Sequence, residues 1–334
     1  MCDLYLVEQG TCLRKDQGRF VLQSRRDDDL EIPIREVERI LLFGNIQLST
    51  AAIGTCLGRQ IPVVFLSQAG QYKGHLWSVE RGDLEAERRQ FSKYADANVQ
   101  FDMARRIIRG KLTNSRQLLL RLNRKRTLEP VARVIDGIQR DITALDRADT
   151  LDQLRGYEGI TAARYFPALG QLLINPDFTF RERNRRPPKD PINSLLSFGY
   201  TLLFNNVMSL ILAEGLNPYL GNLHRSEKKL PELVLDLMEE FRSPVVDTLV
   251  VTLVNRRDVQ PDDFTWPTEN GGVYIADGAR RRFIQKFEAG MSQTVKHPDV
   301  QEPVTYRRAI HYQVKRYKRW LLHDEPYVPF LRTV

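Results

Sequence analysis

Residues 81–90, RGDLEAERRQ, mark the point where the apolar pattern of this 334-residue chain changes its period. Before them, apolar runs are as short as strands and are separated by glycines. After them, apolar residues recur every three or four positions, which is the spacing of one helix face. A chain of this length favours two domains. We therefore predict an α+β protein in which residues 1–83 form a small β-rich domain and residues 84–334 form a larger all-α domain.

The first part carries short apolar runs that predict strands at residues 4–7, 20–22 and 63–66, and an alternating run, LEIPI, at residues 30–34. Ser49 is predicted to cap a short helix, because its hydroxyl can accept from the first free amide groups. We find no reactive constellation in this part of the chain.

The second part is helical by its periodicity, as in the apolar residues from Phe91 to Ile107 and those from Val131 to Leu145 after Pro130. Residues 195–213, LLSFGYTLLFNNVMSLILA, carry no charge and are long enough to span a bilayer. Asn205 and Asn206 lie near the middle of that segment, where amides in hydrocarbon are costly. We therefore favour a helix buried within the protein, and no membrane.

Composition limits the classes of function. The chain has 50 Lys and Arg against 42 Asp and Glu, a net charge of +8, which favours nucleic acid as a partner without deciding the matter. Three dispersed cysteines, Cys2, Cys12 and Cys56, argue against a disulfide framework and a Cys-ligated zinc site. With no signal peptide in MCDLYLVEQG, a reduced, cytoplasmic location is expected.

A first candidate motif, YEGITAARYF at residues 157–166, places Glu158 in a run of small and aromatic residues. A carboxylate on such a face must be paired, protonated or bound to a metal. From this motif alone a helix cap, or an ion pair with Arg155 or Arg164, remains open.

Two further motifs follow. GLNPYLGNLHR at residues 215–225 forms a tight loop ahead of His224, which alone would be an ordinary structural histidine. LDLMEEFR at residues 235–242 groups Asp236, Glu239 and Glu240 on a helix, where they repel one another unless a cation intervenes. Arg242 and Lys228-Lys229 leave a salt-bridge network open as an alternative.

Taken together, one histidine and several carboxylates suit Mg²⁺ or Mn²⁺ better than a structural zinc. A hard divalent ion is what phosphodiester chemistry needs. Three basic clusters are candidate DNA contacts, although each alone reads as solvated surface. They are Arg181, Arg183, Arg185, Arg186 and Lys189; Arg280 to Arg282; and Lys315, Arg316, Lys318 and Arg319, which we expect to face outward.

At these residues the sequence resembles the CRISPR-associated integrase and endonuclease family of the adaptation module, the "Cas one" proteins. The resemblance runs along almost the whole chain and rests on four motifs in the family's order. They are EGxxAxxYF at 158–166, RxPPxDPINSLLSFGYTLL at 185–203, GLNPYLGNLHR at 215–225 and LDLMEEFR at 235–242.

The resemblance implies a β-sandwich-like N-terminal domain that forms homodimers, and an α-helical C-terminal domain that holds the metal. Glu158, His224 and Glu239 match the metal ligands of the family, and Asp236 matches a supporting acidic position. The implied reaction is transesterification, in which the 3′-hydroxyl of a short DNA fragment attacks the CRISPR repeat. The implied partners are DNA and the small "Cas two" protein.

Two other functions remain open. The same ligands would serve a CRISPR-independent nuclease that cuts branched or single-stranded DNA. A non-catalytic DNA-binding or scaffold protein is less favoured, because no helix-turn-helix or zinc finger is recognisable and acidic groups cluster in a basic chain.

Overall fold

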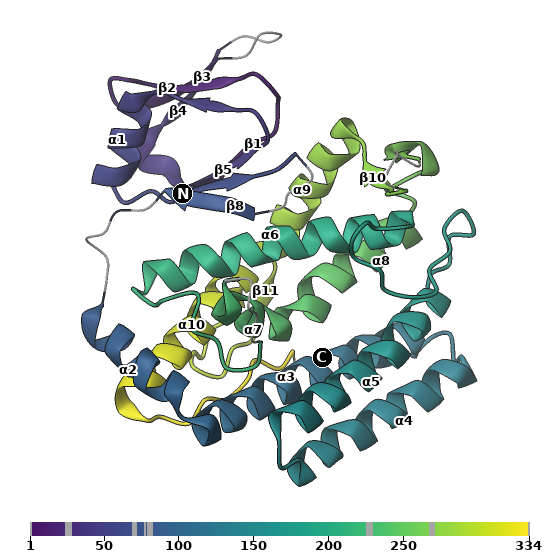
Figure 1. Cartoon of the computed structure of the whole chain (residues 1–334). Coiled ribbons are helices and arrows are strands. Elements are labelled where there is room, and N and C mark those ends of the chain that lie inside the picture. The colour runs from purple at the N-terminus through teal and green to yellow at the C-terminus, as the bar shows by residue number, and fades with distance from the viewer. Residues whose placement is uncertain are drawn as a thin grey trace. The chain divides into compact units, whose positions relative to one another are not determined.

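The computed structural model describes residues 2–23, 29–68, 72–76, 78, 83–224, 230–266 and 271–332. By its internal contacts the chain divides into two compact units, residues 1–82 and 83–334 (Figure 1). Each unit has its own architecture.

Among its described residues the N-terminal unit contains two four-stranded sheets, as the sandwich prediction required. One has the strand order β1-β5-β7-β8 and is parallel except at β8; the other has the order β4-β3-β2-β6. The strands are β1 (Cys2–Leu6), β2 (Cys12–Asp16), β3 (Arg19–Gln23), β4 (Leu30–Pro33), β5 (Val37–Phe43), β6 (Gln47–Leu48), β7 (Val63–Leu66) and β8 (Tyr72–Leu76). A 3₁₀ turn spans Ile34–Glu36.

The predicted strands and cap are present in this unit, although Val7 lies beyond β1 and Ile34 of the alternating run lies in the 3₁₀ turn after β4. The three apolar runs lie in β1, β3 and β7. Helix α1 (Thr50–Gly58) begins at Ser49, whose hydroxyl accepts from the amide of Ala52 at 3.2 Å. Leu13, Phe20, Ile40 and Val63 lie in one fully buried apolar core.

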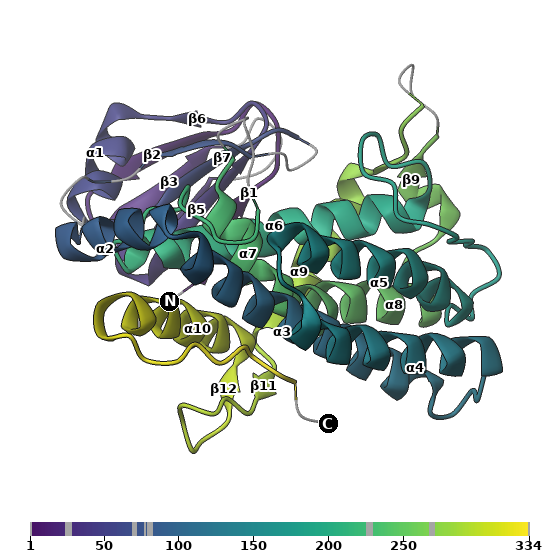
Figure 2. The ribbon, with the colours of Figure 1, turned by 60° about the horizontal axis from the view of Figure 1, so that its bottom comes forward.

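The C-terminal unit is built from helices, of which α3, α4 and α5 lie side by side (Figure 2). They are α2 (Leu84–Ala95), α3 (Ala97–Asn123), α4 (Glu129–Ala144), α5 (Leu151–Gln171), α6 (Pro191–Ala213), α7 (Glu232–Phe241), α8 (Thr248–Asn255), α9 (Asp277–Met291) and α10 (Tyr306–His323). Short turns at Leu145–Arg147 and Pro261–Asp263 are 3₁₀.

The unit also contains two strand pairs that the sequence did not predict, so it is not purely helical. They are β9 (Phe264–Thr265) with β10 (Tyr274–Ile275), and β11 (Thr294–Val295) with β12 (Val304–Thr305). The predicted fold, strands first and a larger helical part after them, is otherwise confirmed.

The apolar spacing from Phe91 to Ile107 continues across a boundary between two helices at Asp96. The Asp96 carboxylate accepts from the amides of Asn98 and Val99, at 2.9 and 3.2 Å, and so caps α3. Because a capping side chain replaces the hydrogen bonds that a continuous helix would make, α2 ends and α3 begins there.

The long apolar segment forms α6. By length and mean hydropathy α6 could cross a membrane, but 72% of its most apolar 18-residue window is buried inside the protein. Asn205 and Asn206 are fully buried, and their amides donate to the carbonyls of Thr201 and Leu202 one turn earlier, at 2.8 and 2.9 Å. Each side-chain amide nitrogen therefore has an acceptor within the same helix, which lowers the cost of burying it.

Two glycines of α5 give a matched test of helix packing. A Cβ at Gly170 would lie 2.0 Å from the backbone oxygen of Phe180, whereas a Cβ at Gly156 would meet nothing within 4 Å. We expect Gly170→Ala to lower the free energy of unfolding by about 1–3 kcal/mol, as overpacking does. Gly156→Ala should raise it by up to about 1 kcal/mol through helix propensity. Urea unfolding of both variants measures the difference, and equal effects would contradict the packing of α5 against residue 180.

Candidate metal centre

The three predicted ligands come from three segments of the helical unit. Glu158 lies on α5 and is partly exposed, Glu239 lies on α7 with only 2% of its side chain exposed, and His224 lies between α6 and α7. The Nε2 atom of His224 lies 3.8 Å from Oε1 of Glu239. The structure thus brings His224 beside Glu239, and it links Glu239 to Glu158 through a fourth residue.

That fourth residue is Lys111 of α3, which the sequence did not single out. Its ammonium forms an ion pair with Glu158 and another with Oε2 of Glu239, the latter at 2.8 Å. The two arginines considered as partners of Glu158 bind elsewhere. Arg155 donates to the Leu223 carbonyl at 2.7 Å, and Arg164 pairs with Asp141 at 3.0 Å.

Asp236 organises the loop that carries His224. Its buried carboxylate accepts from the backbone amides of Asn222, Leu223 and His224, and from Nδ1 of His224 at 2.7 Å. Since Nδ1 faces this carboxylate, Nε2 carries the free lone pair of a neutral ring. The close approach requires Gly221, where a Cβ would lie 2.6 Å from Cβ of Glu232. Only a glycine fits there.

Positive charge keeps Glu239 ionised in spite of its burial. Burial alone would raise the pKa of this carboxyl, but Arg242, Lys111 and His224 outweigh it and lower the pKa to about 2. Arg242 contributes an ion pair of 2.9 Å and lies in a π-helical turn, Arg242–Asp247, between α7 and α8. Burial likewise lowers the pKa of His224, yet Asp236 and Glu239 reverse the shift and raise it.

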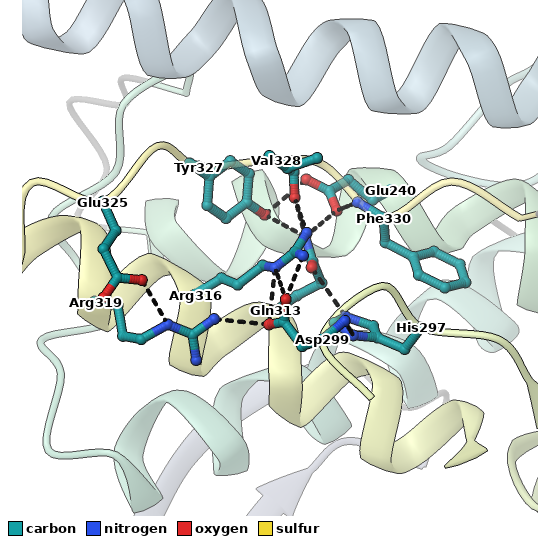
Figure 3. A network of polar contacts seen from close by, with 10 residues as sticks. All are labelled: Glu240, His297, Asp299, Gln313, Arg316, Arg319, Glu325, Tyr327, Val328 and Phe330. Atoms are coloured by element: carbon teal, nitrogen blue, oxygen red, sulfur yellow. Dashed lines mark hydrogen bonds and ion pairs between the residues drawn. The ribbon is translucent and has the colours of Figure 1, made fainter. Parts of the chain in front are cut away.

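Glu240, the third acidic residue of the motif, faces away from this centre toward the C-terminal segment (Figure 3). It accepts from the hydroxyl of Tyr327 at 2.7 Å, the side-chain amide of Gln313 at 2.8 Å and the backbone amide of Phe330 at 2.7 Å. Burial raises the pKa of Glu240 to about 7. Glu240 therefore anchors residues 327–330 rather than joining the metal centre.

A pocket opens beside Lys111 and Glu158. Tyr165, Tyr200, Arg185 and Arg242 contribute to its walls. Below it the two tyrosine hydroxyls donate to Asp247, each at 2.6 Å, so a buried carboxylate fixes both rings. Sequence reasoning missed this group, because Tyr200 and Asp247 lie in segments whose apolar spacing indicates only helix.

The donor set fits a hard divalent ion, although the ligands do not form a preassembled cage. Within the described ranges, no three His, Cys, Asp or Glu side chains already stand close enough to hold a metal. One cation, the Lys111 ammonium, however, already lies against both glutamates, 2.8 Å from the buried Oε2 of Glu239. Two carboxylates and one imidazole are ligands that Mg²⁺ or Mn²⁺ accepts.

The basic segment at residues 181–189 is a loop that mixes exposed and engaged side chains. Arg181, Arg185, Arg186 and Lys189 are exposed. Arg183 instead donates to Asn193 and Ser197 of α6, at 2.7 and 2.9 Å.

The two other basic clusters are largely tied to carboxylates. Arg280 and Arg282 pair with Asp277 and Asp263. Arg316, only 11% exposed, pairs with Asp299 rather than facing outward as expected. The core positions of α10, Ile310, Val314, Tyr317 and Leu321, are buried as their spacing predicted. Lys228-Lys229 lie outside the described residues.

The chain matches the family model described as CRISPR associated protein Cas1 over residues 4–289. It is 36% identical over 328 residues to a CRISPR-associated endonuclease Cas1 of Thermus thermophilus, with 98% of each chain covered. It is also 36% identical over 333 residues to a Cas4 exonuclease/Cas1 endonuclease fusion of Geobacter sulfurreducens. That match covers 98% of this chain, which spans 59% of the fusion's length.

Solved structures share the fold. A Cas1 protein from Thermotoga maritima matches with a TM-score of 0.84 and 25% identity, covering 99% of this chain and all of its own. A casposase bound to integration product matches with a TM-score of 0.86 at 22% identity, over 98% of this chain and 93% of the casposase. A chain of a Cas6-RT-Cas1–Cas2 complex matches with a TM-score of 0.82 at 22% identity, over 97% of this chain and 35% of that chain.

At 22% identity the last two matches bear on the fold alone. Common descent with the family is shown by two findings. The family model matches most of the chain, and relatives are 36% identical over nearly its full length. This protein therefore belongs to the Cas1 family, the endonucleases and integrases of CRISPR adaptation.

Proposed function

We propose that this protein is a metal-dependent DNA integrase and endonuclease that joins short DNA fragments to the CRISPR repeat. The observation that carries the proposal is that one ammonium, that of Lys111, contacts both Glu158 and Glu239, while Nε2 of His224 lies 3.8 Å from Glu239. We assign these three residues as the ligands of Mg²⁺ or Mn²⁺. Such an ion, when bound, polarises the scissile phosphate and stabilises the charge that develops on it.

The chain's own residues prepare this chemistry. Asp236 holds the His224 ring so that Nε2 faces the site, and Arg155 fixes the loop through the Leu223 carbonyl. We therefore assign Asp236 as a supporting residue. Arg242 keeps Glu239 ionised, and so able to act as a ligand, down to low pH.

The proposed reaction is a balanced exchange of phosphodiester bonds. The 3′-oxygen of the fragment forms a new bond to a phosphorus atom of the repeat, and the bond from that phosphorus to its former 3′-oxygen breaks. The proton lost by the attacking hydroxyl ends on the leaving 3′-oxygen. One bond replaces another of the same kind, so no nucleotide cofactor is required. Water in place of the 3′-hydroxyl would give a nuclease.

The proposed partners are DNA and a small Cas2-type protein, supported by the Cas1–Cas2 complexes among the structural neighbours. DNA would approach along the loop at 181–189, because Arg185 of that loop also lines the pocket next to Glu158. Arg181, Arg186 and Lys189 are the further proposed contacts, and Arg183, whose donors are engaged, would position the loop.

Incubation of the full chain and its Cas2-type partner with a labelled fragment and a repeat-bearing plasmid tests the reaction. Joined strands that require Mg²⁺ or Mn²⁺ are expected. Cleavage of branched or single-stranded DNA without joining would favour the CRISPR-independent nuclease instead.

Replacing the proposed ligands should abolish both strand transfer and metal binding. We expect Glu239→Gln and His224→Ala to lose calorimetric Mn²⁺ binding, since each removes a donor atom. His224 is 36% exposed, so its variant should keep its melting temperature within a few degrees. Asp236→Asn should weaken metal affinity by about 10- to 100-fold without abolishing it, as outer ligand partners do. Normal integration by His224→Ala would refute the assignment.

Neutralising the exposed loop should weaken DNA binding for all sequences alike. We expect Arg185→Ala/Arg186→Ala to lower affinity and to reduce the slope of log affinity against log salt concentration by about 1–2, because up to two phosphate contacts disappear. Arg124→Ala/Lys125→Ala removes the same charge from exposed positions at the end of α3 and serves as the control. Equal losses from both pairs, in fluorescence anisotropy, would mean that only overall charge matters.

The N-terminal unit is the proposed homodimer interface, which would present two metal centres to two strand ends. Within it Phe65 and Leu30 are exposed apolar residues. Light scattering should give twice the 38.8 kDa of one chain, and Phe65→Asp should shift the protein toward monomer. Leu84→Asp, at a more exposed apolar position of the helical unit, is the control. A mass of one chain at the highest soluble concentration would refute the dimer.

A further inference from the structure

Lys111 holds the position between the two glutamates that a divalent ion would need. Its ammonium contacts Glu158 from α5 and Glu239 from α7, and it reaches them from α3. It therefore ties three helices together at one point. Only 16% of the Lys111 side chain is exposed, so little water screens these two ion pairs.

Lys111 is not the only cation that neutralises Glu239. Arg242 lies 2.9 Å from the other oxygen of that carboxylate, and it lowers the pKa of Glu239 as Lys111 does. Glu158 forms an ion pair with Lys111, while Arg155 and Arg164 bind other groups. Lys111 is thus the cation that the two proposed ligands share.

A divalent ion and the ammonium cannot share this position. Both need the same carboxylate oxygens, and two cations at contact distance repel each other strongly where little water screens them. We propose that Lys111 is a built-in counter-ion that competes with the divalent ion for Glu158 and Glu239 and leaves them when the ion binds. This inference rests on the proposed metal-dependent function.

A DNA phosphate at the pocket would give the displaced Lys111 ammonium a second partner. Lys111 lines it together with Arg185 and Tyr200, on the side where the backbone of DNA is proposed to enter. A phosphate that attracts Lys111 away from the glutamates would free the metal site. DNA and the divalent ion should therefore bind cooperatively, and the coupling should be reciprocal.

Calorimetric titration of Mn²⁺ into the full chain, with and without a short DNA duplex, tests the competition. Lys111→Met keeps the length of the side chain and removes its charge. We expect it to bind Mn²⁺ about 10-fold more tightly than wild type without DNA, and to lose the gain in affinity that DNA gives wild type. Its melting temperature without metal should fall, because Glu158 and Glu239 then lack their shared cation.

Lys93→Met is the matched control. Lys93 is 15% exposed and pairs with Asp324, so the same change in a similar setting should leave Mn²⁺ affinity unchanged. Lys111→Arg keeps the charge and should bind Mn²⁺ no more tightly than wild type. A lost structural contact cannot explain tighter metal binding together with lower stability, so this pairing of effects separates competition from simple packing.

Acetylation of wild-type lysines, read by peptide mass spectrometry, provides a measurement that needs no variant. Mn²⁺ should raise the reactivity of Lys111 and leave that of Lys93 unchanged. If wild type binds Mn²⁺ at Glu239 but Lys111→Met binds it no more tightly, or if metal does not change the reactivity of Lys111, the competition is refuted and the metal site stands. If neither wild type nor Lys111→Met binds Mn²⁺, both proposals fail.

Discussion

A carboxylate taken out of water stays ionised only where cations or hydrogen-bond donors lie against it, and helix α7 buries three within five positions. Asp236, Glu239 and Glu240 would repel one another if they faced the same way. The structure turns each toward a different set of partners. Asp236 receives the amides of the loop before α7, Glu239 receives Lys111 and Arg242, and Glu240 receives the C-terminal segment.

These partners come from distant parts of the chain. Lys111 lies on α3, whereas Tyr327 and Phe330 follow α10, 87 and 90 residues after Glu240. Each of the three carboxylates therefore gains its partners only when the helical unit has folded around α7. The geometry of the centre thus depends on the whole helical unit and not on the motifs alone. The residues that position the proposed ligands lie far from them in the sequence.

The sequence predicted what depends on local pattern. Strands β1, β3 and β7, the Ser49 cap and the burial of α6 all follow from period and composition. The motifs singled out Glu158, His224 and Glu239, whose role as metal ligands stays a prediction. The sequence did not predict Lys111, because nothing within α3 distinguishes that lysine from one at the surface. The break at Asp96 was missed because a capping carboxylate leaves the apolar spacing intact. Strands β9 to β12, two residues each, are too short to show a period.

Charge counting explains why an acidic centre suits a protein proposed to hold DNA. Asp236, Glu158 and Glu239 carry a formal charge of −3, and Lys111 and Arg242 supply +2, so with a neutral His224 the centre is left at −1. A centre of that sign repels a phosphodiester. A divalent ion that displaces Lys111 changes the sum to 0, with Arg242 and the ion set against the three carboxylates, and so removes the repulsion. If Lys111 then turns toward the DNA, its positive charge neutralises the phosphate instead of the glutamates. Phosphate binding and metal binding would thereby depend on each other through the same few side chains, and DNA would be held at the centre only when the ion needed for its chemistry is in place.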